Sequence, residues 1–314
     1  MKEIHGYWIE NDLKSDKSGF AKWGFALKNN KSYFIKEFLT PTYPLDGTAL
    51  SAERIISERK MCLQFEEEKR EFYQILDKCA MDGNVVTVSD FFRNDSKYYI
   101  VTEKIDAAPF DPVDISKSDF EQKLLIMKII LHAMTTLHKN GIVHGDIKPE
   151  NILFKRTEKG VLTAKIIDFD SSFLEAKPPK DEELQGDMVY FAPESFFLVA
   201  GQDITLTHKI DVFALGILFH QYFAGRIPYF DESEYEYAYE AVLDGAEIKM
   251  DDSMPEFLKT VLMRMIDKEP ENRPELEEVL KVLLENSSEP KEEAVKEPPK
   301  PRFIGLMGKN SFNR

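Results

Sequence analysis

Residues 144–151 bring three chemically useful side chains into one short run: Asp146, Lys148 and Asn151. A carboxylate, an ammonium group and a carboxamide at this spacing are what phosphoryl transfer needs, because that reaction depends on positioning and charge neutralisation. A second acidic motif follows at residues 165–170, where an apolar run typical of a short β-strand ends in Asp168. The two runs together predict a phosphoryl-transfer site.

These runs resemble the catalytic loop and the metal-binding Asp-Phe-Gly triplet of the eukaryotic-like Ser/Thr protein kinases. The resemblance implies that Asp146 accepts the proton of the incoming hydroxyl and that Lys148 neutralises the moving phosphoryl group. It further implies that Asn151 and Asp168 hold Mg²⁺, and that Lys148 marks Ser or Thr as the acceptor. The expected cofactors are ATP and Mg²⁺, and the expected partner is a protein substrate.

Further motifs stand in the family's order between residues 7 and 285. The glycine-rich loop corresponds to residues 19–24, and the strand lysine to Lys36. The Ala-Pro-Glu motif at residues 192–194 follows, and Arg273 resembles the late arginine that pairs with its carboxylate. Residues 211–216 resemble the start of a large buried helix. Several motifs in the correct order are far less open to coincidence than one.

The resemblance also implies how Lys36 is held. Lys36 would bind the α- and β-phosphates of ATP and pair with a glutamate of the family's αC helix. Glu71 is the predicted partner, while Glu67 and Glu68 lie one turn away on nearly the same face and remain alternatives.

The remaining nucleotide contacts are carried over by position. Backbone groups of Glu103, Lys104 and Ile105 would bind adenine, with Thr102 as the gatekeeper and Leu153 as the floor of the pocket. The predicted loop and roof residues are Gly19, Ala21, Gly24, Ala26 and Phe34. Two roof positions differ from the family in opposite directions, since Ala26 stands where Val is usual and Phe34 where Ala is usual. The two side chains are therefore expected to share the roof.

Three departures from the family pattern concern backbone freedom and charge. Ala21 replaces the middle glycine of the loop, so the backbone approach to phosphate must tolerate a methyl group. Asp170 replaces the glycine of the metal-binding triplet and places a second carboxylate near Asp168. Gly145 replaces an arginine that in the family receives an activation-loop phosphate.

A fourth departure is Asp187, which stands where the family has threonine. An acid there is expected to bind Lys148 and to repel Asp146. Two alternatives to an active protein kinase therefore stay open. One is a small-molecule kinase of the aminoglycoside or choline type, which also has His-Gly-Asp at the catalytic loop. The other is a catalytically impaired scaffold.

Composition excludes several other function classes. The formal charge of −15 disfavours nucleic acid and anionic membrane surfaces as partners, because both require an excess of Lys and Arg. The longest apolar stretches are interrupted by charges, so buried helices are expected and membrane spans are not. Cys62 and Cys79 are expected to be reduced, apolar residues, which favours a cytoplasmic protein. The oligomeric state stays open.

The expected fold class is α+β, a bilobal kinase-like fold. Residues 1–103 would form a small N-lobe, with an antiparallel sheet and one long helix near residues 51–78, where apolar residues recur every three, four or seven positions. Residues 104–286 would form a larger, mainly helical C-lobe. Residues 287–314, rich in Pro, Glu and Lys apart from an apolar cluster at 303–307, are expected to be a disordered tail.

Overall fold

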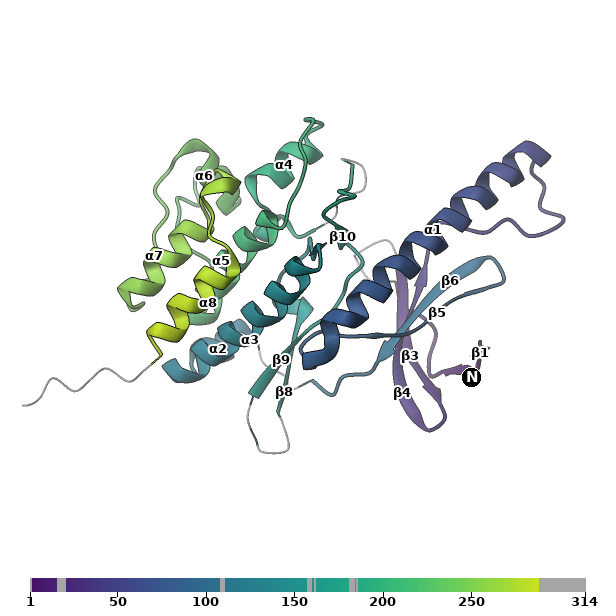
Figure 1. Ribbon diagram of the computed structural model, residues 1–314, viewed down its shortest axis with the longest axis horizontal. Helices are drawn as coiled ribbons and strands as arrows, with labels where there is room; N and C mark the ends of the chain where they lie inside the picture. Colours follow the sequence, from purple (N-terminus) through teal and green to yellow (C-terminus); the bar gives the residue numbers. More distant parts are fainter. Residues whose placement is uncertain are drawn as a thin grey trace, which may run out of the picture.

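The computed structural model describes residues 2–15, 21–107, 111–156, 160, 162–180, 184 and 186–287. The predicted loop residue Gly19 and, apart from Ser287, the predicted tail lie outside the described residues. The described chain forms two lobes, one built on a sheet and one mainly helical (Figure 1). The predicted bilobal α+β class is confirmed.

The N-lobe sheet is antiparallel and has the strand order β1-β2-β3-β4-β6-β5. Its strands are β1 (Lys2–Ile4), β2 (Tyr7–Ile9), β3 (Ala21–Lys28), β4 (Lys31–Phe38), β5 (Val88–Asn94) and β6 (Lys97–Glu103). Asn29 and Asn30 both have positive φ, 52° and 60°, which is the geometry of a two-residue hairpin turn and joins β3 to β4. This tight turn sets the pairing of Phe25 with Phe34.

The sheet buries a different set of side chains on each face, because successive residues of a strand point to opposite sides. One face forms a small apolar core away from the C-lobe. Its members come from all six strands: Ile4, Tyr7, Ile9, Ala26, Ile35, Phe92, Tyr99 and Val101. The other face contributes to the main core and faces the C-lobe.

The long predicted helix is α1 (Ala52–Cys79), which begins after Ser51, whose side chain accepts a hydrogen bond from the Arg54 amide. Its C-terminal half packs on the sheet through residues that include Phe72, Tyr73 and Leu76. Its N-terminal half extends beyond the sheet (Figure 1). Both cysteines, one on each half, are buried and unbonded, as expected for small apolar residues.

The C-lobe surrounds α5 (Lys209–Ala224), which is buried on nearly all sides because it is apolar around its whole circumference. The other helices are α2 (Pro112–Ser116), α3 (Phe120–Lys139), α4 (Pro193–Val199), α6 (Ala238–Asp244), α7 (Glu256–Met265) and α8 (Leu276–Glu285). Two small antiparallel two-stranded sheets pair β7 (Ile142–Val143) with β10 (Phe173–Leu174), and β8 (Ile152–Arg156) with β9 (Leu162–Ile166). Within the described residues, no helix has the length and apolarity needed to cross a bilayer.

Candidate active site

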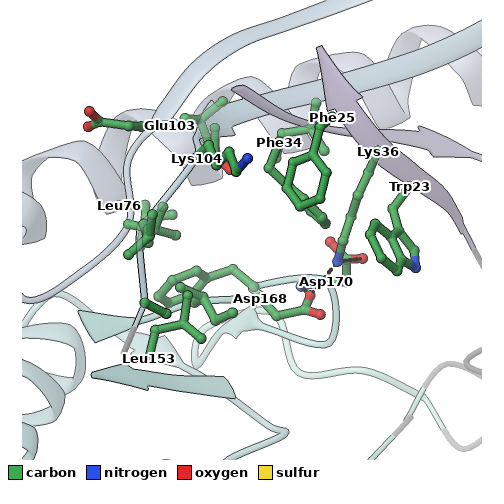
Figure 2. Close-up of a pocket in the computed structure, with 18 of the residues that line it drawn as sticks. Trp23, Phe25, Phe34, Lys36, Leu76, Glu103, Lys104, Leu153, Asp168 and Asp170 are labelled. Carbon is green, nitrogen blue, oxygen red and sulfur yellow. Dashed lines mark hydrogen bonds and ion pairs between the residues drawn. The ribbon is translucent and has the colours of Figure 1, made fainter. Parts of the chain in front are cut away.

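A cavity of about 520 Å³ lies between the N-lobe sheet and the C-lobe (Figure 2). Both lobes, α1 and the segment between the lobes line it: Trp23, Phe25, Phe34, Lys36, Tyr73, Leu76, Val86, Val88, Ile100, Thr102, Glu103, Lys104, Ile105, Ala107, Glu150, Leu153, Ile167, Asp168, Phe169 and Asp170. Most of these side chains are apolar, and three charged ones, Lys36, Asp168 and Asp170, gather at one end. A planar apolar group with a charged tail fits such a cavity.

Three aromatic side chains form the roof. Phe25 lies opposite Phe34 in the strand register, and the two rings meet edge to face with centroids 5.9 Å apart. The ring of Trp23 stacks on Phe34 at 5.7 Å. Trp23 and Phe25 come from β3 and Phe34 from β4; Figure 2 shows Phe25 and Phe34 above the cavity and Trp23 at its side, next to Lys36. Phe34 therefore lies where the sequence predicted, but its partner is Phe25.

The predictions for Gly24 and Ala26 are wrong, because neither residue lines the cavity. Ala26 is fully buried in the small core on the far side of the sheet. A side chain at Gly24 would meet Leu13 at 2.8 Å, again away from the cavity. Ala21, at the start of β3, is half-buried and is not among the cavity-lining residues. Trp23 and Phe25, which alternate with Gly24 and Ala26 along β3, are the residues that line the cavity instead.

Ala26→Val should therefore affect stability and leave nucleotide binding unchanged. The added methyl groups enter a closed apolar core, where overpacking costs about 1–3 kcal/mol of unfolding free energy. Chemical denaturation and the KM for ATP measure the two effects separately. Phe25→Ala, one position away on the cavity face, is the matched comparison and should raise KM. A higher KM for Ala26→Val would place Ala26 back in the roof.

The segment between the lobes and the floor lie as expected. Thr102 pairs with Phe34 in the sheet, and Glu103 and Ile105 continue the cavity wall from it. Leu153 of β8 lines the cavity below them (Figure 2). Lys104 also lines the wall, and its ammonium lies 4.6 Å from the centre of the Phe25 ring.

Lys36 lies at the charged end of the cavity and binds two carboxylates. Its Nζ is 2.7 Å from Asp168 Oδ1 and 2.7 Å from Asp170 Oδ2. Burial lowers the pKa of Lys36, but Asp170 and Asp168 outweigh it and bring the pKa above its ordinary value. Burial raises the pKa of Asp168, but the charge and hydrogen bond of Lys36 outweigh this effect, so the pKa falls below its ordinary value. Both groups are therefore charged near neutral pH.

The predicted pairing of Lys36 with Glu71 is wrong. Glu71 is half-exposed and binds Lys177 on the outer side of α1, at 2.8 Å. Tyr73 and Leu76 occupy the face of α1 that lines the cavity. Position 71 is turned about 200° from position 73 around a helix with 3.6 residues per turn, so both cannot face the cavity.

The catalytic-loop residues converge on the carboxylate of Asp146. Lys148 Nζ lies 2.8 Å from Asp146 Oδ2, and the side-chain amide of Asn151 donates to the same oxygen at 3.0 Å. The backbone amide of Asp187 donates to Asp146 Oδ1 at 3.1 Å. The carboxylate is thus held in one orientation by three donors from two segments.

Asp187 does not act as expected from the sequence. Its carboxylate accepts a hydrogen bond from the Val189 amide at 3.0 Å and caps the short 3₁₀ turn Met188–Tyr190. Lys148 binds Asp146, so the predicted pairing of Asp187 with Lys148 is wrong. The backbone amide of Asp187, which any residue except proline would supply, is the group that approaches Asp146.

A buried carboxylate fixes the start of the catalytic loop. Asp211, at the beginning of α5, accepts from the amides of His144 and Gly145 at 2.8 and 2.9 Å. It also contacts the ring of His138 at 2.9 Å. Burial raises the pKa of Asp211, and the hydrogen bonds and charge of His138 outweigh it, so the pKa falls below its ordinary value. The loop is therefore anchored to the most deeply buried helix of the C-lobe.

Gly145 occupies a position where a side chain does not fit. Its φ is +78°, and a Cβ there would lie 2.7 Å from the backbone oxygen of Ser171. An arginine, which the resembling family has here, would need the backbone of the following segment to move. The substitution thus follows from the close approach of residues 145 and 171.

Gly145→Ala should lower the unfolding free energy by more than Gly201→Ala does. Both glycines have positive φ, which costs an L-residue about 1–2 kcal/mol, but a Cβ at Gly201 meets nothing within 4 Å. The difference between the variants isolates the contact with Ser171 and should be about 1–3 kcal/mol. Equal losses in chemical denaturation would show that this contact is not important.

Two oxygen donors suit a hard cation. The Asn151 side-chain amide donates two hydrogen bonds to Asp146, at 2.7 Å to the backbone oxygen and 3.0 Å to the carboxylate, which leaves its carbonyl oxygen for a cation. Asp168 adopts φ +63°, a conformation that Asp tolerates, and lines the cavity. Asn151 and Asp168 thus fit Mg²⁺ that completes its octahedron with water and phosphate oxygens.

The segment that bears Asp187 is fixed at its far end by a buried ion pair. Arg273 donates to both carboxylate oxygens of Glu194, from Nη1 at 2.6 Å and from Nη2 at 2.8 Å. The predicted pairing of these two residues is confirmed. The cavity residues that sequence reasoning missed include Trp23, Phe25 and Tyr73; strand alternation and helix phase were the signals that could have found them.

The geometry has counterparts among known proteins. A family model described as a protein kinase domain matches residues 48–283. The matched range begins after β3 and β4, so it leaves out the predicted glycine-rich loop, whose sequence departs from the family pattern. The solved structure of the Cydia pomonella granulovirus kinase PK-1 matches with a TM-score of 0.61 and 20% sequence identity, covering 88% of this chain and 93% of that one. At this identity the match shows the fold.

Curated relatives match over shorter parts of their own length. Calcium-dependent protein kinase 14 of Arabidopsis thaliana is 24% identical over 286 residues, 89% of this chain and 50% of the relative. Calcium-dependent protein kinase 4 of Plasmodium falciparum is 32% identical over 157 residues, 49% of this chain and 28% of the relative. The chain thus spans half or less of the length of these relatives.

Proposed function

The chain is a member of the protein kinase family, and on this basis we propose that it transfers the γ-phosphoryl group of ATP to Ser or Thr hydroxyls of protein substrates. The observation that supports this most is the three-donor arrangement around Asp146, next to a cavity that ends in Lys36 and Asp168. A carboxylate held in this way can orient a hydroxyl and accept its proton.

The other residues have roles that follow from their positions. Lys36 is a charged ammonium at the end of an apolar cavity, where it can bind the phosphates of a nucleotide whose base lies beneath the aromatic roof. Lys148, next to Asp146, can neutralise charge on the phosphoryl group as it moves. Asn151 and Asp168 would hold Mg²⁺, which neutralises phosphate charge when bound.

A protein acceptor is favoured over a small molecule by the segment from Asp187 to Glu194. Its two ends are fixed, by the Asp187 amide on Asp146 and by the buried pair of Glu194 with Arg273. A rigid segment beside the catalytic carboxylate can support an extended peptide. The proposal for Ser and Thr rests on Lys148 and on relatives such as the serine/threonine-protein kinase TIO of Arabidopsis thaliana, 29% identical over 208 residues.

An acceptor panel tests the proposal. The protein is incubated with γ-labelled ATP and Mg²⁺, first alone, then with a generic basic protein, and then with amino sugars or choline. We expect label in protein, with phosphoserine or phosphothreonine after acid hydrolysis. Label in the small molecules alone would replace the proposal with a small-molecule kinase.

A further inference from the structure

Lys36 receives its counter-charges from one short segment of the C-lobe. Its side chain is only 13% exposed, and a nearly buried ammonium needs bound partners to remain charged. Both partners, Asp168 Oδ1 and Asp170 Oδ2, lie at 2.7 Å (Figure 2). One of the two, Asp168, is the candidate metal ligand. Asp170 is therefore the partner whose carboxylate has no other role in the proposed function.

The side of α1 nearest to Lys36 presents no carboxylate to it. Lys69, Tyr73 and Leu76 follow one another at helical spacing, and Tyr73 and Leu76 line the cavity. Burial lowers the pKa of Lys69. The positive charge of Lys36 lowers this pKa further, whereas the negative charge of Asp170 raises it. Burial raises the pKa of Tyr73, and the charges of Asp170 and Asp168 raise it further. The carboxylate of Asp170 thus acts on Lys36 and on this face of α1.

The four acids in the middle of α1 lie elsewhere. Glu66 accepts a hydrogen bond from the Tyr98 hydroxyl at 2.7 Å, and Glu68 accepts one from Gln64 at 2.9 Å. Glu71 binds Lys177, and Glu67 is exposed. Lys69 stands on the helix face where an acid would have to be in order to bind Lys36.

We propose that Asp170 is a positioning residue for Lys36 and takes the place of a helix carboxylate. In this arrangement the polarity is reversed: α1 contributes a cation, Lys69, whose ammonium lies 5.8 Å from the centre of the Phe38 ring of β4, and the segment after Asp168 contributes the anion that binds Lys36. The inference rests on the proposed function, because Lys36 must be held for the nucleotide that it binds. It explains why a side chain occurs at position 170.

The backbone allows this substitution without strain. Asp168 has the positive φ of this segment, +63°, whereas Asp170 is not among the residues with positive φ. The Asp170 amide also points back to Asp168 Oδ1, at 3.4 Å. A side chain at position 170 therefore costs little stability. Its negative charge also offsets the repulsion between the ammonium groups of Lys36 and Lys69.

The test moves the acid from one segment to the other. Asp170→Gly should weaken binding of a fluorescent ADP analogue and raise the KM for ATP by about 10- to 100-fold, the usual contribution of a hydrogen bond between charged groups. The kcat should fall less than KM rises. Adding Lys69→Glu to Asp170→Gly places a carboxylate on α1 opposite Lys36 and should recover most of the lost affinity.

The controls separate positioning from fold and from metal binding. Glu71→Gln, on the outer side of the same helix, should leave nucleotide affinity unchanged, and the denaturation midpoints should show that every variant is folded. Lys69→Glu alone keeps Asp170 and should not improve binding. All affinities are measured at saturating Mg²⁺, and the Mg²⁺ dependence is titrated separately.

Three results would overturn the inference. The first is nucleotide affinity in Asp170→Gly equal to that of the wild type. The second is a loss that disappears at saturating Mg²⁺, which would make Asp170 a metal ligand. The third is a folded double variant as weak as Asp170→Gly. Wild-type protein that binds the ADP analogue without transferring phosphate would defeat the proposed function only, since the affinities still report on Lys36.

Discussion

Asp146→Asn should lower kcat for phosphoryl transfer by at least ~10²-fold while the protein stays folded. An amide has nearly the shape of a carboxylate but cannot accept the proton of the incoming hydroxyl. Asp146 is half-buried at the cleft, and its ligands, Lys148, Asn151 and the Asp187 amide, all come from segments that are anchored independently of it. Initial rates at saturating ATP, together with thermal denaturation, measure the two quantities.

Asp119→Asn is a suitable control for this experiment. Asp119 caps α3 by accepting a hydrogen bond from the Gln122 amide at 2.7 Å, and asparagine caps helices equally well. Its kcat should match that of the wild type. If Asp146→Asn retained comparable turnover, the hydroxyl would have to lose its proton elsewhere, and the role assigned to Asp146 would be wrong.

Arg273→Ala should lower the unfolding free energy by about 3–5 kcal/mol, because it leaves the buried carboxylate of Glu194 without a partner. The Arg273 side chain is completely buried, and it also donates to the backbone oxygens of Asp267, Lys209 and Lys268 at 2.9, 2.9 and 3.2 Å. One side chain thus connects four points of the C-lobe. Equilibrium denaturation in urea measures the loss.

A surface pair provides the comparison for Arg273. Arg264 and Glu278 are 2.6 Å apart but each is 48% exposed, so Arg264→Ala should cost no more than about 1 kcal/mol. Removing both buried charges, with Arg273→Met and Glu194→Leu, should recover part of the loss and leave the three carbonyl contacts unmet. A similar loss for Arg273→Ala and Arg264→Ala would mean that burial does not strengthen the pair.

The parts of the site that the sequence predicted are those in which neighbouring residues act together. Asp146, Lys148 and Asn151 share one loop, so their spacing alone brings them together. The pairing of Glu194 with Arg273 was predicted only through the resemblance to a family, because nothing local connects residues 79 positions apart. The helical and strand regions were predicted from the periodicity of apolar residues, and the structure has helices and strands in these regions.

The parts that were missed depend on which way a regular element faces. Gly24 suggested a glycine loop, but the pairing of Phe25 with Phe34 decides which β3 residues face the cavity. A shift of one residue exchanges the two faces of a strand, and composition does not reveal it. The choice of Glu71 failed for the same reason on a helix, where two positions rotate a side chain to the opposite side. The close approach of Gly145 to Ser171 joins segments whose contact no local pattern encodes.

In the proposed function, the cavity and the loop around Asp146 act together in phosphoryl transfer to protein. The most direct measurement titrates Mg²⁺ and ATP into the wild-type protein with a generic basic protein present, and follows nucleotide binding and phosphoprotein in the same sample. We expect saturable binding, with ADP and phosphoprotein formed in equal amounts, and phosphoprotein formed at least ~10²-fold more slowly by Asp146→Asn. Saturable binding without any transfer would contradict the proposed function and would identify the chain as a nucleotide-binding scaffold.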